Sequence, residues 1–461
     1  HCFRDKPDIY IWVEYLINGA WEVIYHPPIP CNIRWNYACA TPINIQVTDP
    51  RVPGNCCCNC HLPGDLVWIR SVGHTSVRHI NQDFSIVQPP PGQTVAYNRI
   101  GLTHAGAWGD PSYLPTAVGD YKRPFGGSPN LYMGFGSSLP NNSIYYYRWS
   151  YRQLRDANLS PVSDSFKAFD ALINKGYQFE YIDSNGDTQS APNNVKLGPF
   201  TIGTNDNLYI IPPERPTMAP FNAPETSPDW HEPTDHMLTM AFDSAKLKNG
   251  NVLGGDGLYE FRLEVFDKNG NLAIVPKQTL KTPVYNDASL SENAPDELLD
   301  LASATTASAY KMLMRIENGK CSGEIFKVNV NGAPASLDCC GFVNYKPAGV
   351  EADLSLSFEA TQPRNFAVFS FSVVKGTCGS VNNAGTSGMV IDSADGYTLT
   401  SGEYEKHFTP EALLDNCYNN GAGKAAFSET LYVAAMATDG YSRQSGKDAG
   451  DVAAFALEPG S

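Results

Sequence analysis

The sequence predicts a mostly β protein with several antiparallel β-sandwich domains and a few short helices. Two observations favour this fold class. Gly (39), Pro (34) and Tyr (24) are plentiful, while only 18% of the residues are charged, a balance that suits strands joined by tight turns. Short alternating runs of apolar and polar residues also recur, separated by Gly, Asn and Asp, and this is the pattern of antiparallel strands.

At 461 residues the chain is too long for one ordinary core. Composition and strand pattern divide it into five segments: a partial β-sandwich whose upstream strands are missing (1–50), a Cys-rich linker (51–64), a β-rich domain with an aromatic strand and a short helix (65–212), a second β-sandwich (217–285) and a C-terminal disulfide-stapled β-domain (286–461). Prolines at 212, 213 and 216 mark one of these boundaries.

The first element is predicted to be a hairpin. Residues 8–17 and 20–25 alternate in hydrophobicity and are joined by Asn18-Gly19. Asn-Gly between two alternating runs is the strongest short-range hairpin signal, because a type I′ turn needs positive φ at both central positions. Residues 43–47 are expected to form a third strand.

An aromatic strand is expected over residues 144–152. Alternation places Tyr145, Tyr147, Trp149 and Tyr151 on one face. Such a row is either the buried face of a sheet or a platform on which sugars stack, and we favour the core because aromatic side chains carry so much packing area.

Helices are expected at 163–174, 295–302 and 409–416, the last with Thr409 as its cap and Pro410 at its first position. Hairpin turns are expected at 183–187 and 267–271, both rich in Asp, Asn and Gly.

The first of these turns also suggests a weak calcium site. Asp183, Asn185 and Asp187 resemble the oxygen-rich start of a calcium loop, but the twelfth position is Asn194 rather than a bidentate Glu. A plain hairpin turn explains the segment better, and we predict no cofactor with calcium as the minority alternative.

Twelve cysteines lie towards the two ends of the chain and are candidates for structural disulfides. They are Cys2, Cys31, Cys39, Cys56, Cys57, Cys58, Cys60, Cys321, Cys339, Cys340, Cys378 and Cys417. Both groups are odd in number, so a leftover cysteine in each could bond across the fold or to another chain. A thiolate metal site over 56–60 is the alternative, but the second ligand pair of a zinc site is missing.

Other classes of function find little support in the sequence. The net charge of −15 without a basic cluster argues against a nucleic-acid partner. No apolar run approaches the length needed for a membrane span. No serine elbow, phosphate loop or dinucleotide-binding motif is present, and His231 and His236 are separated by Pro233, which disrupts a helical zinc motif.

Two segments resemble extracellular modules. Residues 7–45 resemble the later strands of a transthyretin-like or carboxypeptidase-regulatory-like sandwich. The run 256–261 (DGLYEF), followed by 265–271 (VFDKNGN), resembles the last strands of an immunoglobulin-like domain. The second resemblance implies an immunoglobulin-like β-sandwich over 217–285, in which the Tyr259 hydroxyl bonds upstream backbone as in a tyrosine corner. Together they imply a modular surface protein.

From these observations we expect an extracellular structural or adhesive protein, one segment of a longer cell-surface or filament polypeptide, that associates with itself or with other surface subunits. It is not expected to be an enzyme. The alternative is a carbohydrate-binding protein or glycan-degrading enzyme that uses a Tyr/Trp-lined groove to bind glycans. A viral structural subunit is less compatible with so many cysteines.

Overall fold

The computed structural model describes residues 13–17, 20–25, 64–82, 99–104, 120–213, 216, 226–232, 234–250, 252–282, 294–338, 341–376, 379–381, 383–420 and 422–460. The chain divides into two compact units, His1–His61 and Leu62–Ser461. In the first, β1 (Val13–Ile17) pairs antiparallel with β2 (Ala20–Tyr25), and Ile17 lies opposite Ala20. The predicted hairpin is confirmed over these strands, while Asn18, Gly19 and the strand expected at 43–47 lie outside the described residues.

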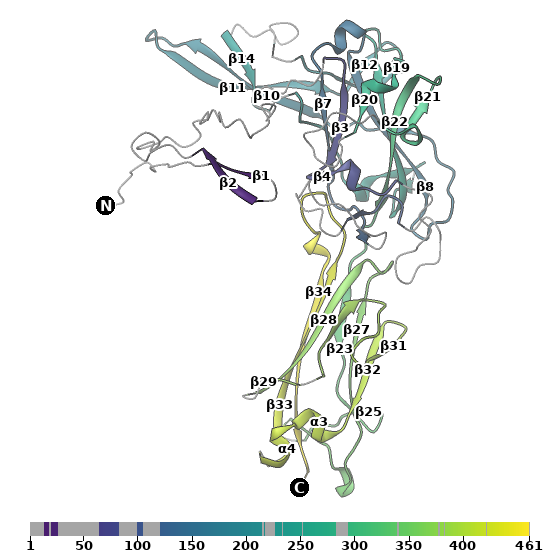
Figure 1. Ribbon diagram of the computed structural model, residues 1–461. Helices are drawn as coiled ribbons and strands as arrows, with labels where there is room; N and C mark the ends of the chain where they lie inside the picture. Colours follow the sequence, from purple (N-terminus) through teal and green to yellow (C-terminus); the bar gives the residue numbers. More distant parts are fainter. Residues whose placement is uncertain are drawn as a thin grey trace. The chain divides into compact units, whose positions relative to one another are not determined.

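The second unit begins with a β-sandwich of two sheets (Figure 1). The larger sheet has the order β12 (Phe200–Ile202), β13 (Asn205–Ile210), β8 (Tyr146–Arg155), β18 (Gly257–Phe266), β22 (Thr306–Ile316) and β19 (Val275–Pro276), with β21 (Leu299–Leu301) paired to β22 and β9 (Lys167–Ala168) to β8. The smaller sheet has the order β15 (Met237–Ala241), β7 (Asn130–Phe135), β3 (Val67–Val72) and β20 (Leu280–Lys281), with β4 (Thr75–Ser76) paired to β3. Both sheets contribute side chains to one buried core.

Strands from three of the expected segments meet in the larger sheet. β18 lies between β8 and β22 and pairs antiparallel with both. The expected boundaries at 212–217 and 285–286 therefore do not coincide with the edges of sheets. The Tyr259 hydroxyl does donate to the Gly255 carbonyl at 2.7 Å, which is the upstream bond predicted for it.

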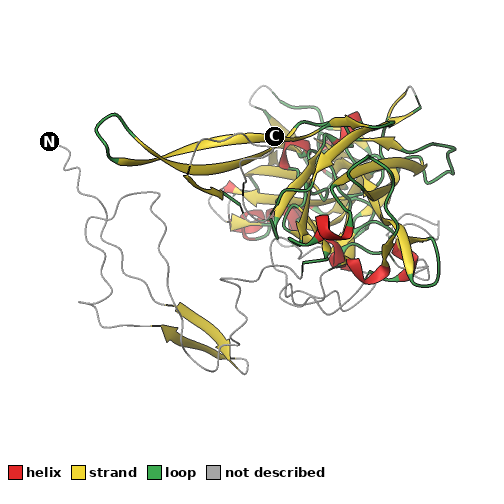
Figure 2. Cartoon of the chain, turned by 90° about the horizontal axis from the view of Figure 1, so that it is seen from above, coloured by secondary structure: helices red, strands yellow, loops and turns green. Residues whose placement is uncertain are grey.

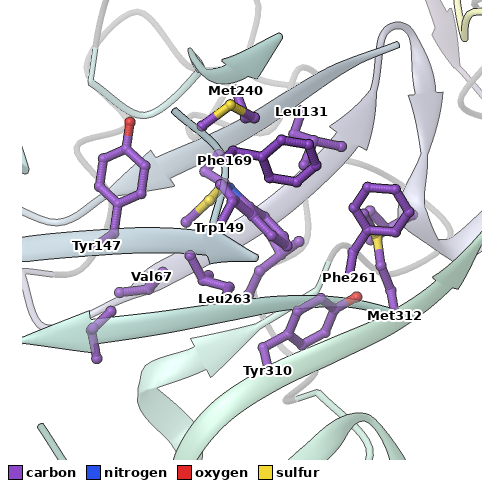
Figure 3. Packing of buried hydrophobic residues seen from close by; sticks show 14 of the residues in the cluster. Val67, Leu131, Tyr147, Trp149, Phe169, Met240, Phe261, Leu263, Tyr310 and Met312 are labelled. Carbon is purple, nitrogen blue, oxygen red and sulfur yellow. The ribbon is translucent and has the colours of Figure 1, made fainter. Parts of the chain in front are cut away.

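The two faces of β8 differ as alternation predicts. Tyr147 and Trp149 are fully buried in the core, and both donate to Thr239, the tyrosine to its carbonyl at 3.1 Å and the indole to its hydroxyl at 3.2 Å. Figure 3 shows Trp149 packed among the other buried side chains of this core. On the opposite face Arg148 pairs with Glu264 at 2.9 Å and Arg152 with Glu260 at 2.5 Å.

A long hairpin extends from the first sandwich (Figure 2). It consists of β10 (Ile173–Ile182) and β11 (Thr188–Gly198), and β14 (Thr226–Trp230) pairs with β10. The predicted turn at 183–187 is confirmed, because Asp183 N–H donates to the Asp187 carbonyl at 2.9 Å. The turn at 267–271 is confirmed in the same way, with Asp267 N–H donating to the Asn271 carbonyl at 2.9 Å.

A second β-sandwich follows, drawn in green to yellow in Figure 1. One sheet has the order β25 (Ala333–Pro334), β24 (Asn329–Val330), β27 (Leu354–Thr361), β32 (Glu403–Phe408) and β31 (Thr398–Thr400), with β23 (Ser322–Ile325) paired to β27. The other has the order β26 (Phe342–Asn344), β34 (Ala449–Glu458), β33 (Ala425–Ala435), β28 (Ala367–Lys375) and β29 (Gly379–Ser380), with β30 (Thr386–Met389) paired to β28. They enclose a separate core in which Phe358 stacks on Tyr404 at 4.8 Å.

The remaining elements are short. They are the sheets β5 (Thr103–His104) with β6 (Tyr121–Arg123) and β16 (Lys248–Asn249) with β17 (Val252–Leu253), the helices α3 (Pro410–Leu414) and α4 (Asn416–Asn420), and 3-10 turns at Val77–His79, Leu139–Asn142, Ser244–Lys246, Lys277–Thr279, Asp296–Leu298, Pro347–Gly349 and Ser445–Lys447. The predicted helix at 409–416 is confirmed at α3, where the Thr409 hydroxyl accepts from Ala412 N–H at 3.2 Å.

Two predicted helices are wrong. Residues 163–174 contain β9 and the start of β10 instead, because Phe169 N–H donates to the Trp149 carbonyl and so extends the sheet edge. Residues 295–302 form one 3-10 turn (Asp296–Leu298) followed by β21, which pairs with β22. In both segments apolar side chains at helical spacing are satisfied by packing against a strand, and tertiary context overrides the local pattern.

Candidate functional site

The two sandwiches of the second unit are joined by more than the connecting chain. Phe125 N–H donates to the Arg315 carbonyl at 2.7 Å, and the Phe125 carbonyl accepts from Glu317 N–H at 2.7 Å. The neighbouring Gly126 N–H donates to the Thr438 carbonyl of the second sandwich at 2.8 Å. Phe125 therefore forms a parallel bridge to Ile316 on one side and to Thr438 on the other.

A buried ionic cluster lies at this junction. Glu317, whose side chain is 1% exposed, accepts from Gly319 N–H at 2.7 Å, from the Gln362 amide at 3.0 Å and from Arg364 Nη2 at 2.6 Å. Arg364 also pairs with Asp256. Asp256 comes directly before β18, and Arg364 lies in the turn between β27 and β28, so the cluster connects the two sandwiches. We call Asp256, Glu317 and Arg364 the junction cluster.

The surroundings of the junction cluster shift the pKa of Asp256 and of the neighbouring Arg315. Burial raises the pKa of Asp256 to about 6, and the neighbouring Glu317 carboxylate adds to this shift. Burial also lowers the pKa of Arg315 to about 10, and the charge of Glu317 opposes that shift. Arg315 is 1% exposed, and its Nε and Nη1 find no hydrogen-bond partner within the described ranges. The junction cluster is thus a buried network of ion pairs and hydrogen bonds between the two sandwiches.

A second feature is an outer sheet face without charged side chains. Its members come from alternate positions of β28, β33 and β34, which are adjacent strands. They are Val368, Ser370, Ser372, Val374, Ala426, Ser428, Thr430, Tyr432, Gly450, Val452, Ala454 and Ala456. Val452 is 69% exposed and Tyr432 45% exposed. We call these twelve residues the uncharged face.

Ion pairs bound the uncharged face at its two ends. Lys424 pairs with Glu458 at 2.7 Å at one end, and Arg443 pairs with Asp448 at 2.5 Å at the other. Strand alternation explains the composition, because the inward positions of β28 and β33 fill the second core while the outward ones are small or uncharged. Its exposed apolar side chains, Val368, Val374, Tyr432 and Val452, make this face a candidate interaction surface.

The aromatic row lies in the core, as favoured from the sequence, and three of its four residues are unavailable for the alternative ligand platform. Tyr147 and Trp149 are fully buried and Tyr151 is 8% exposed. Tyr145 precedes β8 and is half-buried. The row therefore belongs to the core, where its aromatic area stabilises the sandwich.

The predicted calcium residues form an ordinary turn. The Asp183 carboxylate accepts from Asn185 N–H at 2.9 Å, from Asp187 N–H at 3.0 Å and from the Gln189 amide at 3.1 Å. The two backbone bonds lower the pKa of Asp183. Across the described part of the chain, no three His, Cys, Asp or Glu side chains converge as a metal site.

Most of the predicted disulfide residues cannot be placed. Cys2, Cys31, Cys39, Cys56, Cys57, Cys58, Cys60, Cys339, Cys340 and Cys378 lie outside the described residues. Cys321 is a free thiol in the described part of the chain, and its cross-link stays a prediction because Cys339, Cys340 and Cys378 lie outside the described residues. Cys417 lies in α4 and packs against the second core.

The junction cluster and the uncharged face were not predicted from the sequence. Asp256, Glu317 and Arg364 are isolated charges in different segments, and no spacing rule connects them. The uncharged face had a partial signal in 367–373, where apolar residues alternate with Ser370 and Ser372, but the outward positions can be assigned to one face only once the strands are paired.

Comparisons with known proteins do not assign the chain to a family. No protein-family model matches the chain, and no curated protein matches it. Among the described residues, no helix is both long enough and apolar enough to cross a membrane.

Proposed function

We propose that this chain is an extracellular structural or adhesive protein, a segment of a longer cell-surface or filament polypeptide, whose copies associate through the uncharged face. The single observation that carries the proposal is the uncharged face. Two copies with a net charge of −15 each repel one another over most of their surfaces. A face without carboxylates is where that repulsion is weakest.

The composition of the uncharged face suits packing of one sheet against another. Ala, Ser and Val side chains let two flat sheets approach closely, and Tyr432 and Val452 supply apolar area. A face that meets its own copy about a two-fold axis contacts itself, so one set of residues serves both partners. The ion pairs at its ends would then lie at the rim, where charges are tolerated.

The junction cluster supports the structural part of the proposal. Bonds from Gly126 and Arg364 connect the sandwiches at points far apart in the sequence, so tension on the second sandwich is shared by several segments. The alternative, a carbohydrate-binding or glycan-degrading protein with a Tyr/Trp-lined groove, loses its platform because Tyr147 and Trp149 are buried.

Sedimentation velocity over a range of concentrations tests the proposal. We expect the full chain to associate reversibly, and Val452→Glu to weaken that association by placing a carboxylate in the uncharged face. Val350→Glu is the matched control, because Val350 is 70% exposed and lies outside the face, whereas Val452 is 69% exposed. A chain that stays monomeric at every concentration, or one that responds equally to both substitutions, contradicts the proposal. Reducing and non-reducing gels of the same samples separate interchain disulfides from this contact.

A further inference from the structure

A polar cavity of about 320 Å³ lies where the base of the β10–β11 hairpin meets β7 and β15. Tyr132, Lys175, Asn194, His231, Glu232 and Leu238 are among its lining residues. Its volume falls in the range of small-ligand sites, about 300–1,000 Å³. It shares no lining residue with the junction cluster or the uncharged face.

Lys175 is a buried member of the cavity lining. Its side chain is 5% exposed, and Nζ donates to the Glu232 carbonyl at 2.6 Å and lies 5.2 Å from the centroid of the Trp230 ring. Burial lowers the pKa of Lys175 to about 8, and the Glu232 and Asp235 carboxylates oppose this shift. An ammonium group has three N–H donors. Within the described residues, the Lys175 ammonium donates one hydrogen bond, to the Glu232 carbonyl.

Backbone contacts hold the wall around Lys175 in place. His231 N–H donates to the Gly176 carbonyl at 3.0 Å. A Cβ on Gly176 would lie 2.7 Å from His231 Nδ1, so a side chain at this position would displace the imidazole. Asn194 lies opposite Gly176 on β11, and the Tyr132 hydroxyl accepts a hydrogen bond from the Tyr441 hydroxyl at 2.6 Å. The backbone around Lys175 is thus held in place before any ligand binds.

The chemistry of the lining favours an uncharged ligand rich in hydroxyl groups. The amide of Asn194 both donates and accepts, the Lys175 ammonium donates, and the Glu232 carboxylate accepts. An anionic ligand would meet the Glu232 carboxylate in the lining and the nearby charge of Asp235, and these two carboxylates outnumber the single ammonium. A hydroxyl group can pair with every one of these partners, and Leu238 and the Tyr132 ring offer apolar surface to C–H groups.

We propose that this cavity binds a single uncharged sugar unit, with Lys175, Asn194 and Glu232 as its polar contacts. The proposal does not depend on self-association through the uncharged face. A site of this kind would let the chain hold a glycan on a neighbouring surface while the uncharged face contacts other copies.

Saturation-transfer difference NMR on the full chain tests the proposal with defined probes. The probes are the methyl glycosides of glucose, galactose, mannose and N-acetylglucosamine, with glucuronate as the anionic probe and N-acetylglycinamide as the peptide-like probe. We expect signal from at least one neutral glycoside, weakened about fivefold or more in affinity by Asn194→Ala and by Lys175→Met. Circular dichroism and thermal melting check that each variant is folded.

Asn193→Ala is the matched control, because Asn193 is the neighbouring residue on the other face of β11, where its amide donates to the Tyr177 hydroxyl at 3.1 Å. This variant should bind the glycoside as the unchanged chain does. The proposal is overturned if no neutral glycoside gives signal, if only glucuronate or only N-acetylglycinamide does, or if Asn194→Ala binds as tightly as Asn193→Ala.

Discussion

Arg364, in the turn between β27 and β28, binds both carboxylate oxygens of Glu317, which follows β22 of the other sandwich. Arg364→Ala should therefore leave a buried carboxylate without its main partner. We expect a loss of about 3–5 kcal/mol in the free energy of unfolding, the usual cost of breaking a buried ion pair from one side. Urea denaturation followed by tryptophan fluorescence measures it.

Lys346→Ala is the control for that measurement. Lys346 pairs with Glu351 at 3.2 Å, and both side chains are at least a third exposed. Solvent screens exposed pairs of this kind, so Lys346→Ala should lose much less stability than Arg364→Ala. Equal losses of unfolding free energy in the two variants would show that the buried ion pairs of Arg364 do not stabilise the contact between the sandwiches.

The stability of the junction should depend on pH through Asp256. Its pKa is raised from 3.8 to about 6, so the folded state holds the proton more tightly than the unfolded state. The stabilisation from this group is complete below about pH 4 and is lost as the pH rises through about 6. Asp256→Asn mimics the protonated carboxyl, so its stability relative to the unchanged chain should increase between pH 4 and 6. Unfolding curves collected at half-unit pH intervals test this, and parallel pH profiles would refute it.

Glu429 should produce a separate pH effect in the second sandwich. It is 2% exposed, and burial, followed by the charge of Asp451, raises its pKa from 4.5 to about 8. The stabilisation it provides is therefore complete below its unfolded pKa and is lost as the pH rises through about 8. Glu429→Gln should hold its melting temperature better than the unchanged chain between pH 7 and 9. A melting temperature that falls equally in both proteins over this range would contradict the assignment.

Cys321 should react slowly as a thiol. Burial raises its pKa to about 11, and the Asp448 carboxylate adds to this shift. Because the thiolate is the reactive form, alkylation by iodoacetamide at pH 8 should be much slower in the folded chain than in urea. Peptide mass spectrometry with timed quenching follows the modification of this residue. Labelling of Cys321 at the same rate in both conditions would show that its surroundings are open.

Local signals in the sequence predicted turns and strand faces well. The Asp183 and Asp267 carboxylates each accept hydrogen bonds from backbone N–H groups of their own turns. The residues that determine each turn therefore lie within five positions of the sequence. The burial of Trp149 could be predicted because side chains of a strand alternate between two faces, so every second residue of β8 lies on the core side. Thr409 could be recognised as a cap because the following Pro410 can only begin a helix.

Signals that depend on distant partners were not predictable. Phe166 and Phe169 have helical spacing, but Phe166 lies under the Arg152 guanidinium at 4.6 Å and Phe169 in the first core, which requires an extended chain. The junction cluster joins three residues that are far apart in the sequence, and the cavity around Lys175 needs three separate pairs of strands. Contacts between residues so far apart in the sequence depend on how the strands pair, and no short stretch of sequence encodes that pairing.

The bridge made by Phe125 affects whether the two sandwiches stay associated after proteolytic cleavage of the connection between them. A protease that cleaved the connection near Lys320 would leave the second sandwich held by the Gly126–Thr438 and Thr438–Pro124 hydrogen bonds, which come from a segment nearly two hundred residues earlier. The two halves of a nicked chain would therefore remain together as a non-covalent complex under native conditions. Expressing the second sandwich by itself would instead expose the Thr438 backbone that Phe125 normally covers, and an uncovered edge of this kind invites aggregation.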